Sequence, residues 1–140
     1  MAGYSGTPLV QKFGIKPDAR LHFVNAPPDF ASTLGPLPVG VEQVDGAAKE
    51  LDVAVLFVKD QAALAERFPQ VAGRLASAGM LWVAWPKKAS GVPTDLTENL
   101  IRDIGLAAGL VDTKVCAIDD VWSGLKFVYR LKDRPGRSRK

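Results

Sequence analysis

The segment Asp52–Val58 constrains the fold of this chain more than any other. After its first residue it is an unbroken apolar run rich in β-branched side chains, which is typical of a central parallel strand buried on both faces. The residues that follow repeat an apolar side chain at helical spacing: Leu64, Phe68, Val71 and Leu75. A second apolar run, Met80–Trp85, comes next. Strand, helix and strand in this order predict a β-α-β unit, and therefore an α/β fold with a parallel sheet.

The rest of the chain continues this alternation. Besides the two apolar runs, we expect four strands, at residues 20–25, 41–44, 113–118 and 125–131. The connection over residues 119–124 is too short for a parallel crossover, so the last strand must run antiparallel to the strand before it.

Capping residues, glycine and proline mark the helices. We expect short helices at residues 7–12 and 28–34, and a longer one at 95–108, where Asp95 and Glu98 have the spacing of a capping box. Another helix should begin at Asp60 and end at Gly79. Pro69 should kink or split that helix, because proline lacks the N–H that a helix interior needs.

The turn after the first strand, Asn25-Ala26-Pro27-Pro28, contains no glycine. In nucleotide-binding α/β domains, glycines at this turn let the backbone approach a cofactor. Two prolines remove backbone donors and stiffen the chain here. We therefore predict no cofactor, and expect S-adenosylmethionine and dinucleotides to bind weakly or not at all.

The basic residues are concentrated at the end of the chain. From Arg130 onward there are six basic residues and one acidic residue, whereas the remainder has twelve basic and fourteen acidic residues. The net charge of +3 therefore does not indicate a basic binding face. We expect a single α/β domain over residues 1–132 and a disordered basic tail over 133–140. The charge of this tail indicates one of two roles: weak contact with nucleic acid, or an end of the chain that keeps the protein soluble.

The chain has no predicted membrane segment. No apolar run approaches the roughly 20 residues that span a bilayer, and the N-terminus lacks the pattern of a signal peptide. Cys116 is the only cysteine, which excludes an internal disulfide and fits a reducing compartment. We expect a cytoplasmic protein without membrane contact.

Few residues have the pattern of a catalytic or metal site. His22, the only histidine, lies in a predicted strand and should be structural, because metal sites need several matched ligands. Lys87 and Ser90 have the residue types of a Ser–Lys pair, but no oxyanion-hole pattern accompanies them. Asp119 and Asp120 are better explained as a solvated turn than as a cation site. No metal site is predicted, and we expect a protein that is not an enzyme.

One group of side chains should gather at the carboxyl ends of the strands, where open α/β sheets bind ligands. The candidate ligand site comprises Asn25, Lys59, Trp85, Lys87, Lys88, Ser90, Trp122 and Ser123. The loop with Lys87 and Lys88 leads into a helix N-terminus, whose amides favour anions. Two interpretations stay open. The group forms a pocket for a small anionic ligand or a protein partner, or the tryptophans pack beneath loops while the lysines face water.

The order of β/α units, closing in one antiparallel hairpin, resembles a methyltransferase-like Rossmann sheet over about residues 20–131. One strand and its flanking helices are missing between Val44 and Asp52. The resemblance implies a three-layer, truncated Rossmann-like sheet of about six strands in the order 2-1-3-4-6-5, with only the last strand antiparallel. That family places an acidic residue after its second strand to hold a ribose, and Asp45 is the candidate here.

Several longer segments resemble a family of small bacterial proteins known as a domain of unknown function, DUF3052. They are Ser5–Leu9, Gly14–Pro17, Val24–Pro27, Leu81–Lys88, Thr94–Glu98 and Trp122–Lys126. The resemblance implies a bacterial cytosolic protein and brings no established activity.

Together, these patterns predict a non-catalytic, cytosolic α/β binding or regulatory protein with its ligand or partner site at the carboxyl rim of the sheet. One alternative is an S-adenosylmethionine-dependent transferase with a degenerate cofactor loop. The other is a nucleic-acid-binding accessory protein that acts through the tail.

Overall fold

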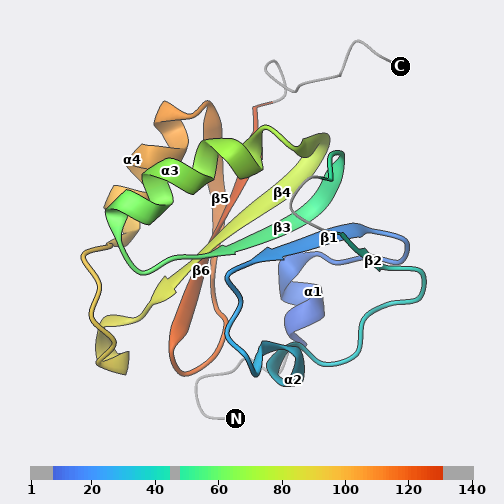
Figure 1. Ribbon diagram of the computed structural model, residues 1–140, viewed down its shortest axis with the longest axis horizontal. Helices are drawn as coiled ribbons and strands as arrows, with labels where there is room; N and C mark the ends of the chain where they lie inside the picture. Colours follow the sequence, from blue (N-terminus) through green and yellow to red (C-terminus); the bar gives the residue numbers. More distant parts are fainter. Residues whose placement is uncertain (1–7, 45–47, 131–140) are drawn as a thin grey trace.

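Six strands form one sheet in the computed structural model, which describes residues 8–44 and 48–130. The strands are β1 (Arg20–Val24), β2 (Glu42–Gln43), β3 (Leu51–Phe57), β4 (Leu75–Pro86), β5 (Leu110–Ala117) and β6 (Trp122–Tyr129). Their order is β2-β1-β3-β4-β6-β5, and β6 runs antiparallel to both of its neighbours (Figure 1). The predicted strand order and the single antiparallel strand are confirmed.

The helices lie on both faces of this sheet (Figure 1). They are α1 (Leu9–Phe13), α2 (Phe30–Leu34), α3 (Gln61–Ala72) and α4 (Glu98–Ala107), with a short 3-10 helix at Lys88–Ser90. Side chains of β3 alternate between the two faces. Ala54 and Leu56 pack in the cluster with α3 and α4, whereas Val53 and Val55 pack in the cluster with α1 and α2. The central strand is therefore buried on both sides, as its apolar run predicted.

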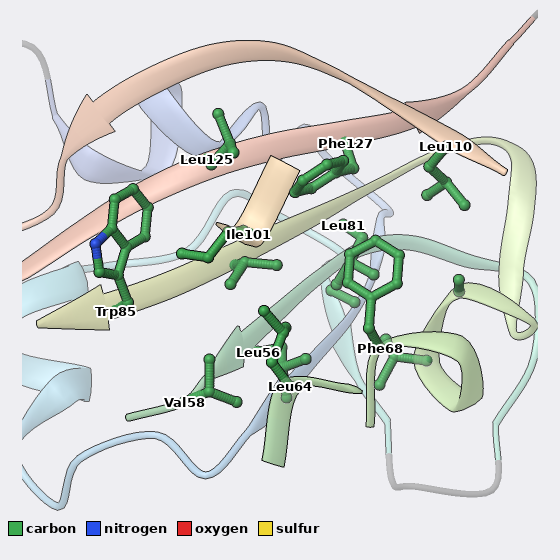
Figure 2. Packing of buried hydrophobic residues seen from close by; sticks show 14 of the residues in the cluster. Leu56, Val58, Leu64, Phe68, Leu81, Trp85, Ile101, Leu110, Leu125 and Phe127 are labelled. Atoms are coloured by element: carbon green, nitrogen blue, oxygen red, sulfur yellow. The ribbon is translucent and has the colours of Figure 1, made fainter. Parts of the chain in front are cut away.

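Aromatic side chains pack against one another on each face of the sheet. On the α3–α4 face, the rings of Phe68 and Phe127 meet edge to face with centroids 5.1 Å apart, among the apolar side chains in Figure 2. On the opposite face, Trp82 packs against Phe13 at 5.3 Å, and its indole Nε1 donates a hydrogen bond of 3.0 Å to the Phe13 carbonyl. That bond ties β4 to the end of α1.

The predicted helix end at Gly79 is wrong, because Gly79 lies inside β4. Helix α3 ends at Ala72, and Leu75 is the first residue of β4. The pairing of β4 with β3 is irregular here, since Leu51 faces Leu75 whereas Val53 faces Met80. A Cβ at Gly79 would overlap the carbonyl oxygen of Leu51. The sheet therefore needs a glycine at this bulge, and Gly79 does not end a helix.

Pro69 does not split α3, which continues to Ala72. The helix resumes its bonding after the proline, because the N–H of Gly73 donates to the Pro69 carbonyl at 3.0 Å. The predicted start of this helix is confirmed: Asp60 is the N-cap, and its Oδ1 accepts from the N–H of Ala63 at 2.8 Å.

The predicted start of the helix at Asp95 is also wrong. Thr97 is the N-cap of α4, and its hydroxyl oxygen accepts from the N–H of Leu100 at 3.2 Å. Glu98 is not part of a capping box but forms a salt bridge with Arg102 one turn later. Asp95 instead bonds to the backbone of α3, as described below.

The last turn is shorter than predicted. Trp122, Ser123 and Gly124 belong to β6 rather than to the turn. Asp119 makes the tighter turn possible, because its Oδ1 accepts from the N–H groups of Val121 at 2.8 Å and Trp122 at 2.9 Å. This pairing places Trp122 on a strand, where the sheet determines the direction of its side chain.

Three sequence predictions fall outside the described residues: the first residue of the helix expected at 7–12, the acidic candidate Asp45 and the basic tail over 133–140. Within residues 8–44 and 48–130, no helix has the length and apolar character needed to cross a membrane.

Candidate functional site

The chain changes direction across the sheet between β1 and β3. From β1 it passes to β2 at the edge, and it then returns to β3 on the other side of β1. In open α/β sheets, the crevice beyond the carboxyl ends of two such strands is the usual place for a ligand. The segments after Val24 and after Phe57 meet at this point, because Val24 pairs with Leu56 in parallel register.

A pocket of about 420 Å³ lies at this switch point. We refer to it as the rim pocket, and its lining residues are Asn25, Ala26, Pro27, Pro28, Phe57, Val58, Lys59, Ala63 and Trp122. Its walls are mainly apolar, and Lys59 is the only ionisable residue among them. Three of the eight predicted site residues, Asn25, Lys59 and Trp122, therefore share one pocket.

Asn25 begins the turn in a left-handed conformation, with φ of 60°. Asparagine tolerates this region better than most residues, so it supplies the bend that glycine supplies in nucleotide-binding turns. The Pro27 carbonyl then accepts from the N–H of Phe30 at 3.0 Å, where α2 begins. Pro27 and Pro28 have no N–H to offer a ligand, so the side-chain amide of Asn25 is one of the few donors left at this turn.

Lys59 provides the positive charge of the rim pocket. Its side chain is exposed and makes no hydrogen bond or ion pair with any described residue, while its carbonyl accepts from the Thr94 hydroxyl at 2.6 Å. Carboxylates already bond two amides at the neighbouring N-terminus of α3. Asp60 accepts from Ala63, and Asp95 Oδ1 accepts from the N–H of Gln61 at 2.9 Å. Two of the first amides of the helix are therefore engaged, and Lys59 is the charged group that the lining offers to an anion.

Trp122 closes the pocket from the α1–α2 face. It is 8% exposed, and its ring meets Phe57 edge to face with centroids 5.1 Å apart. Its indole N–H donates to no acceptor in the described part of the chain, in contrast to Trp82, which donates to Phe13. Buried N–H groups are nearly always paired, so this donor lacks the acceptor that a buried indole usually has.

A second pocket of about 390 Å³ lies at the end of β4. We refer to it as the Trp85 pocket, lined by Trp85, Pro86, Lys88, Thr94, Asp95, Leu96 and Thr97. It shares no lining residue with the rim pocket. Trp85 belongs to the core cluster on the α3–α4 face and Trp122 to the cluster on the opposite face. The structure thus places the two predicted tryptophans on opposite sides of the sheet.

The remaining predicted residues line neither of these two pockets. The Ser90 hydroxyl donates to the Lys87 carbonyl at 2.6 Å and accepts from the N–H of Val92 at 3.1 Å, so it stabilises the turn. The backbone N–H of Lys87 donates to the Val121 carbonyl at 2.7 Å. Ser123 lies opposite Trp85 in the sheet. Their role in ligand binding stays a prediction.

Sequence reasoning missed a third hollow, of about 350 Å³, between β1 and the flank of α3. Its polar lining includes His22, Arg67, Gln70 and Arg74. Arg67 and Gln70 belong to α3, Arg74 follows that helix, and their spacings of three and four residues were the available signal. His22 Nδ1 lies 2.9 Å from the carbonyl oxygen of Val44, which joins β1 to the chain after β2.

Solved structures of methyltransferases have a similar fold. Precorrin-6y C5,15-methyltransferase from Geobacter metallireducens GS-15 matches with a TM-score of 0.60 and 11% identity, over 87% of this chain and 86% of that chain. A SAM-dependent methyltransferase from Aquifex aeolicus matches with a TM-score of 0.58 and 13% identity, over 85% and 86% of the two chains. Magnesium protoporphyrin IX methyltransferase from Synechocystis PCC 6803, solved with bound SAH, matches at 0.55 and 10% identity, over 87% and 78%.

At such low identities the likeness concerns the fold alone, and it confirms the predicted methyltransferase-like Rossmann architecture. No curated protein matches the sequence of this chain. Residues 38–131, more than half of the chain, match the family described as "Protein of unknown function (DUF3052)". The family predicted from the sequence segments is thereby confirmed, and the chain belongs to the DUF3052 family.

Proposed function

We propose that this protein is a non-catalytic, cytosolic binding protein. It holds a small, flat anion with an apolar body in the rim pocket. The position of the rim pocket supports this most directly, because it lies at the switch point between β1 and β3. Its volume of about 420 Å³ is that of a small-molecule site. Lys59 would pair with the negative charge of the ligand, and the Trp122 N–H and the Asn25 amide would orient it.

A binding role suits the lining better than acid–base catalysis. General acid–base chemistry needs a titratable group, commonly a histidine or carboxylate, beside the reacting atoms. The lining residues are a lysine, an asparagine and otherwise apolar side chains, which is the composition of a site that holds and orients.

An S-adenosylmethionine-dependent transferase is the second candidate, and the similarity to methyltransferase folds favours it. Against it stand Pro27 and Pro28, which offer no N–H groups at the turn that faces the rim pocket. A nucleic-acid-binding role for residues 133–140 is the third candidate. It predicts binding that weakens steeply with salt and disappears when these residues are removed.

The test of the first candidate uses anilinonaphthalene sulfonate, a flat apolar anion that fluoresces when its surroundings exclude water. We expect saturable binding at one site with a dissociation constant in the micromolar range. Lys59→Met should weaken binding about fivefold, which corresponds to roughly 1 kcal/mol for a partly exposed ion pair. Lys49→Met is the matched control, because Lys49 precedes β3 whereas Lys59 follows it. It removes the same charge at the opposite end of the strand and should leave the affinity unchanged.

Calorimetry with S-adenosylmethionine separates the first two candidates. A micromolar dissociation constant for this cofactor would favour the transferase and contradict the proposal. Equal affinity of anilinonaphthalene sulfonate for the parent protein, Lys59→Met and Trp122→Phe would show that the dye binds elsewhere, and the rim-pocket proposal would then fail.

A further inference from the structure

The N–H of the buried Trp85 indole has no hydrogen-bond acceptor within the described structure. The residue is 8% exposed and belongs to the apolar cluster beneath α3 and α4. Its Nε1 donates to no acceptor among residues 8–44 and 48–130, although buried donors are nearly always paired. Figure 2 shows the indole nitrogen on the side of the ring turned away from Ile101 and Leu125, toward the end of β4. The unpaired donor thus faces out of the core.

The Trp85 pocket lies at that end of β4. Besides Trp85 itself, Pro86 and Leu96 give it an apolar wall, and Leu96 is 5% exposed. The volume of about 390 Å³ suits a small organic molecule rather than a bare inorganic ion.

Most polar groups around this pocket are already engaged. The Thr94 hydroxyl donates to the Lys59 carbonyl at 2.6 Å and accepts from the N–H of Leu96 at 3.1 Å. The Thr97 hydroxyl oxygen caps α4. Asp95 Oδ1 accepts from Gln61 at the N-terminus of α3, where the helix dipole stabilises the carboxylate charge. These bonds hold the lining in place and tie one oxygen of the Asp95 carboxylate to the start of α3.

Lys88 is the exception among the charged lining residues. Its side chain is exposed and forms no ion pair or hydrogen bond with the part of the chain described here. The Lys88 ammonium and the Trp85 N–H are therefore donors without a partner in the described structure, and they lie beside an apolar wall. A carboxylate complements both donors, because it carries the opposite charge and accepts several hydrogen bonds.

We propose that the Trp85 pocket is a second binding site, independent of the rim pocket, for a small organic carboxylate with an apolar body. The carboxylate accepts from the Trp85 N–H and pairs with Lys88, while the apolar body contacts Pro86 and Leu96. The two sites lie on opposite faces of the sheet and share no lining residue.

Nuclear magnetic resonance of the full chain labelled with nitrogen-15 tests this site. The three tryptophans give three indole N–H signals, which Trp→Phe variants assign. Benzoate is the probe and benzamide its uncharged match. We expect benzoate to shift the Trp85 signal saturably, with a dissociation constant of about 1 mM or below, as suits a ligand of this size. Benzamide should bind at least about fivefold more weakly.

Lys88→Met should weaken benzoate binding about fivefold, because it removes the charge and keeps most of the side-chain length. Lys87→Met is the control, since Lys87 precedes Lys88 in the same loop but does not line the pocket. An unmoved Trp85 signal, equal binding of benzoate and benzamide, or equal effects of the two lysine variants would overturn the proposal. A shift of the Trp122 signal alone would place benzoate in the rim pocket and would equally contradict it.

Discussion

Asp95 Oδ1 accepts a hydrogen bond of 2.9 Å from the backbone N–H of Gln61, a residue 34 positions earlier in the chain. Asp60 bonds to the same helix end, through the N–H of Ala63. Two of the otherwise unpaired amides of α3 are therefore satisfied by carboxylates, one from within the helix cap and one from the loop after β4. The bond ties the wall of the Trp85 pocket to the start of α3.

Asp95→Ala should lower the free energy of unfolding by about 1 kcal/mol, because it leaves the Gln61 N–H without its partner and removes a favourable charge at the helix N-terminus. Asp95→Asn should lose less, since its carbonyl oxygen can still accept the bond. Asp103→Ala is the control on the exposed side of α4 and should change stability by less than about 0.5 kcal/mol. Urea unfolding followed by circular dichroism measures all three. Equal losses for Asp95→Ala and Asp103→Ala would mean that the bond contributes nothing.

Gly79→Ala should destabilise the protein by about 2 kcal/mol or more, because the new Cβ would overlap the carbonyl oxygen of Leu51 across the bulge. Gly73→Ala is the matched control. Gly73 has an α-helical φ of −66°, and a Cβ there would come no closer than 3.4 Å to its neighbours. That change should be neutral or stabilising by up to about 1 kcal/mol. A Gly79→Ala variant as stable as the parent in urea unfolding would contradict the bulge geometry.

The order of the strands could be predicted because each local pattern pointed to the same architecture. Asp52–Val58 has the pattern of a strand that is buried on both faces of the sheet. The short connection before β6 excludes a parallel crossover. The errors arose where a distant contact determines the local structure. In the sequence, Gly79 has the pattern of a helix end and Asp95 the pattern of a cap for its own helix. In the structure, the Leu51 carbonyl lies beside Gly79, and the Gln61 N–H donates to Asp95.

The sequence predicted one group of residues at the rim, whereas the structure divides five of the eight between two pockets. The carboxyl ends of parallel strands share one rim, which sufficed to place Asn25 and Lys59 together. The separation of Trp85 from Trp122 depends on strand register. Trp85 faces Ser123 across the sheet and Trp122 faces Pro86, so the two indoles emerge on opposite sides. The sequence pattern placed Trp122 in a turn, where the direction of a side chain cannot be predicted.

Cys116 should react slowly with alkylating reagents. Burial raises the pKa of its thiol, while the ammonium groups of Lys12 and Lys114 act in the opposite direction. Because only the thiolate reacts, alkylation by iodoacetamide at neutral pH should be at least about threefold slower than in the urea-unfolded chain. The pH at which the rate is half-maximal should be higher for the folded protein.

The lysine contribution to this thiol can be tested separately. Lys12→Met should slow the alkylation of Cys116 further, because it removes a charge that lowers the thiol pKa. Lys16→Met is the control, since Lys16 does not contribute to that pKa. A folded protein whose thiol reacts as fast as the unfolded chain, with the same pH profile, would contradict the burial argument.

A comparison of two tryptophans separates the contribution of the Trp82 hydrogen bond to stability from the effect of the lost ring volume. Trp82 is fully buried and donates to the Phe13 carbonyl at 3.0 Å, whereas Trp122 is 8% exposed and donates to no acceptor in the described residues. The same Trp→Phe substitution removes the same atoms at both positions. Trp82→Phe also leaves the Phe13 carbonyl without its donor, so it should cost about 1–2 kcal/mol more than Trp122→Phe. Urea unfolding followed by circular dichroism avoids the loss of the fluorescent ring as a signal. If the two variants lose equal stability, the bond between β4 and α1 is not what holds the α1 face of the sheet together.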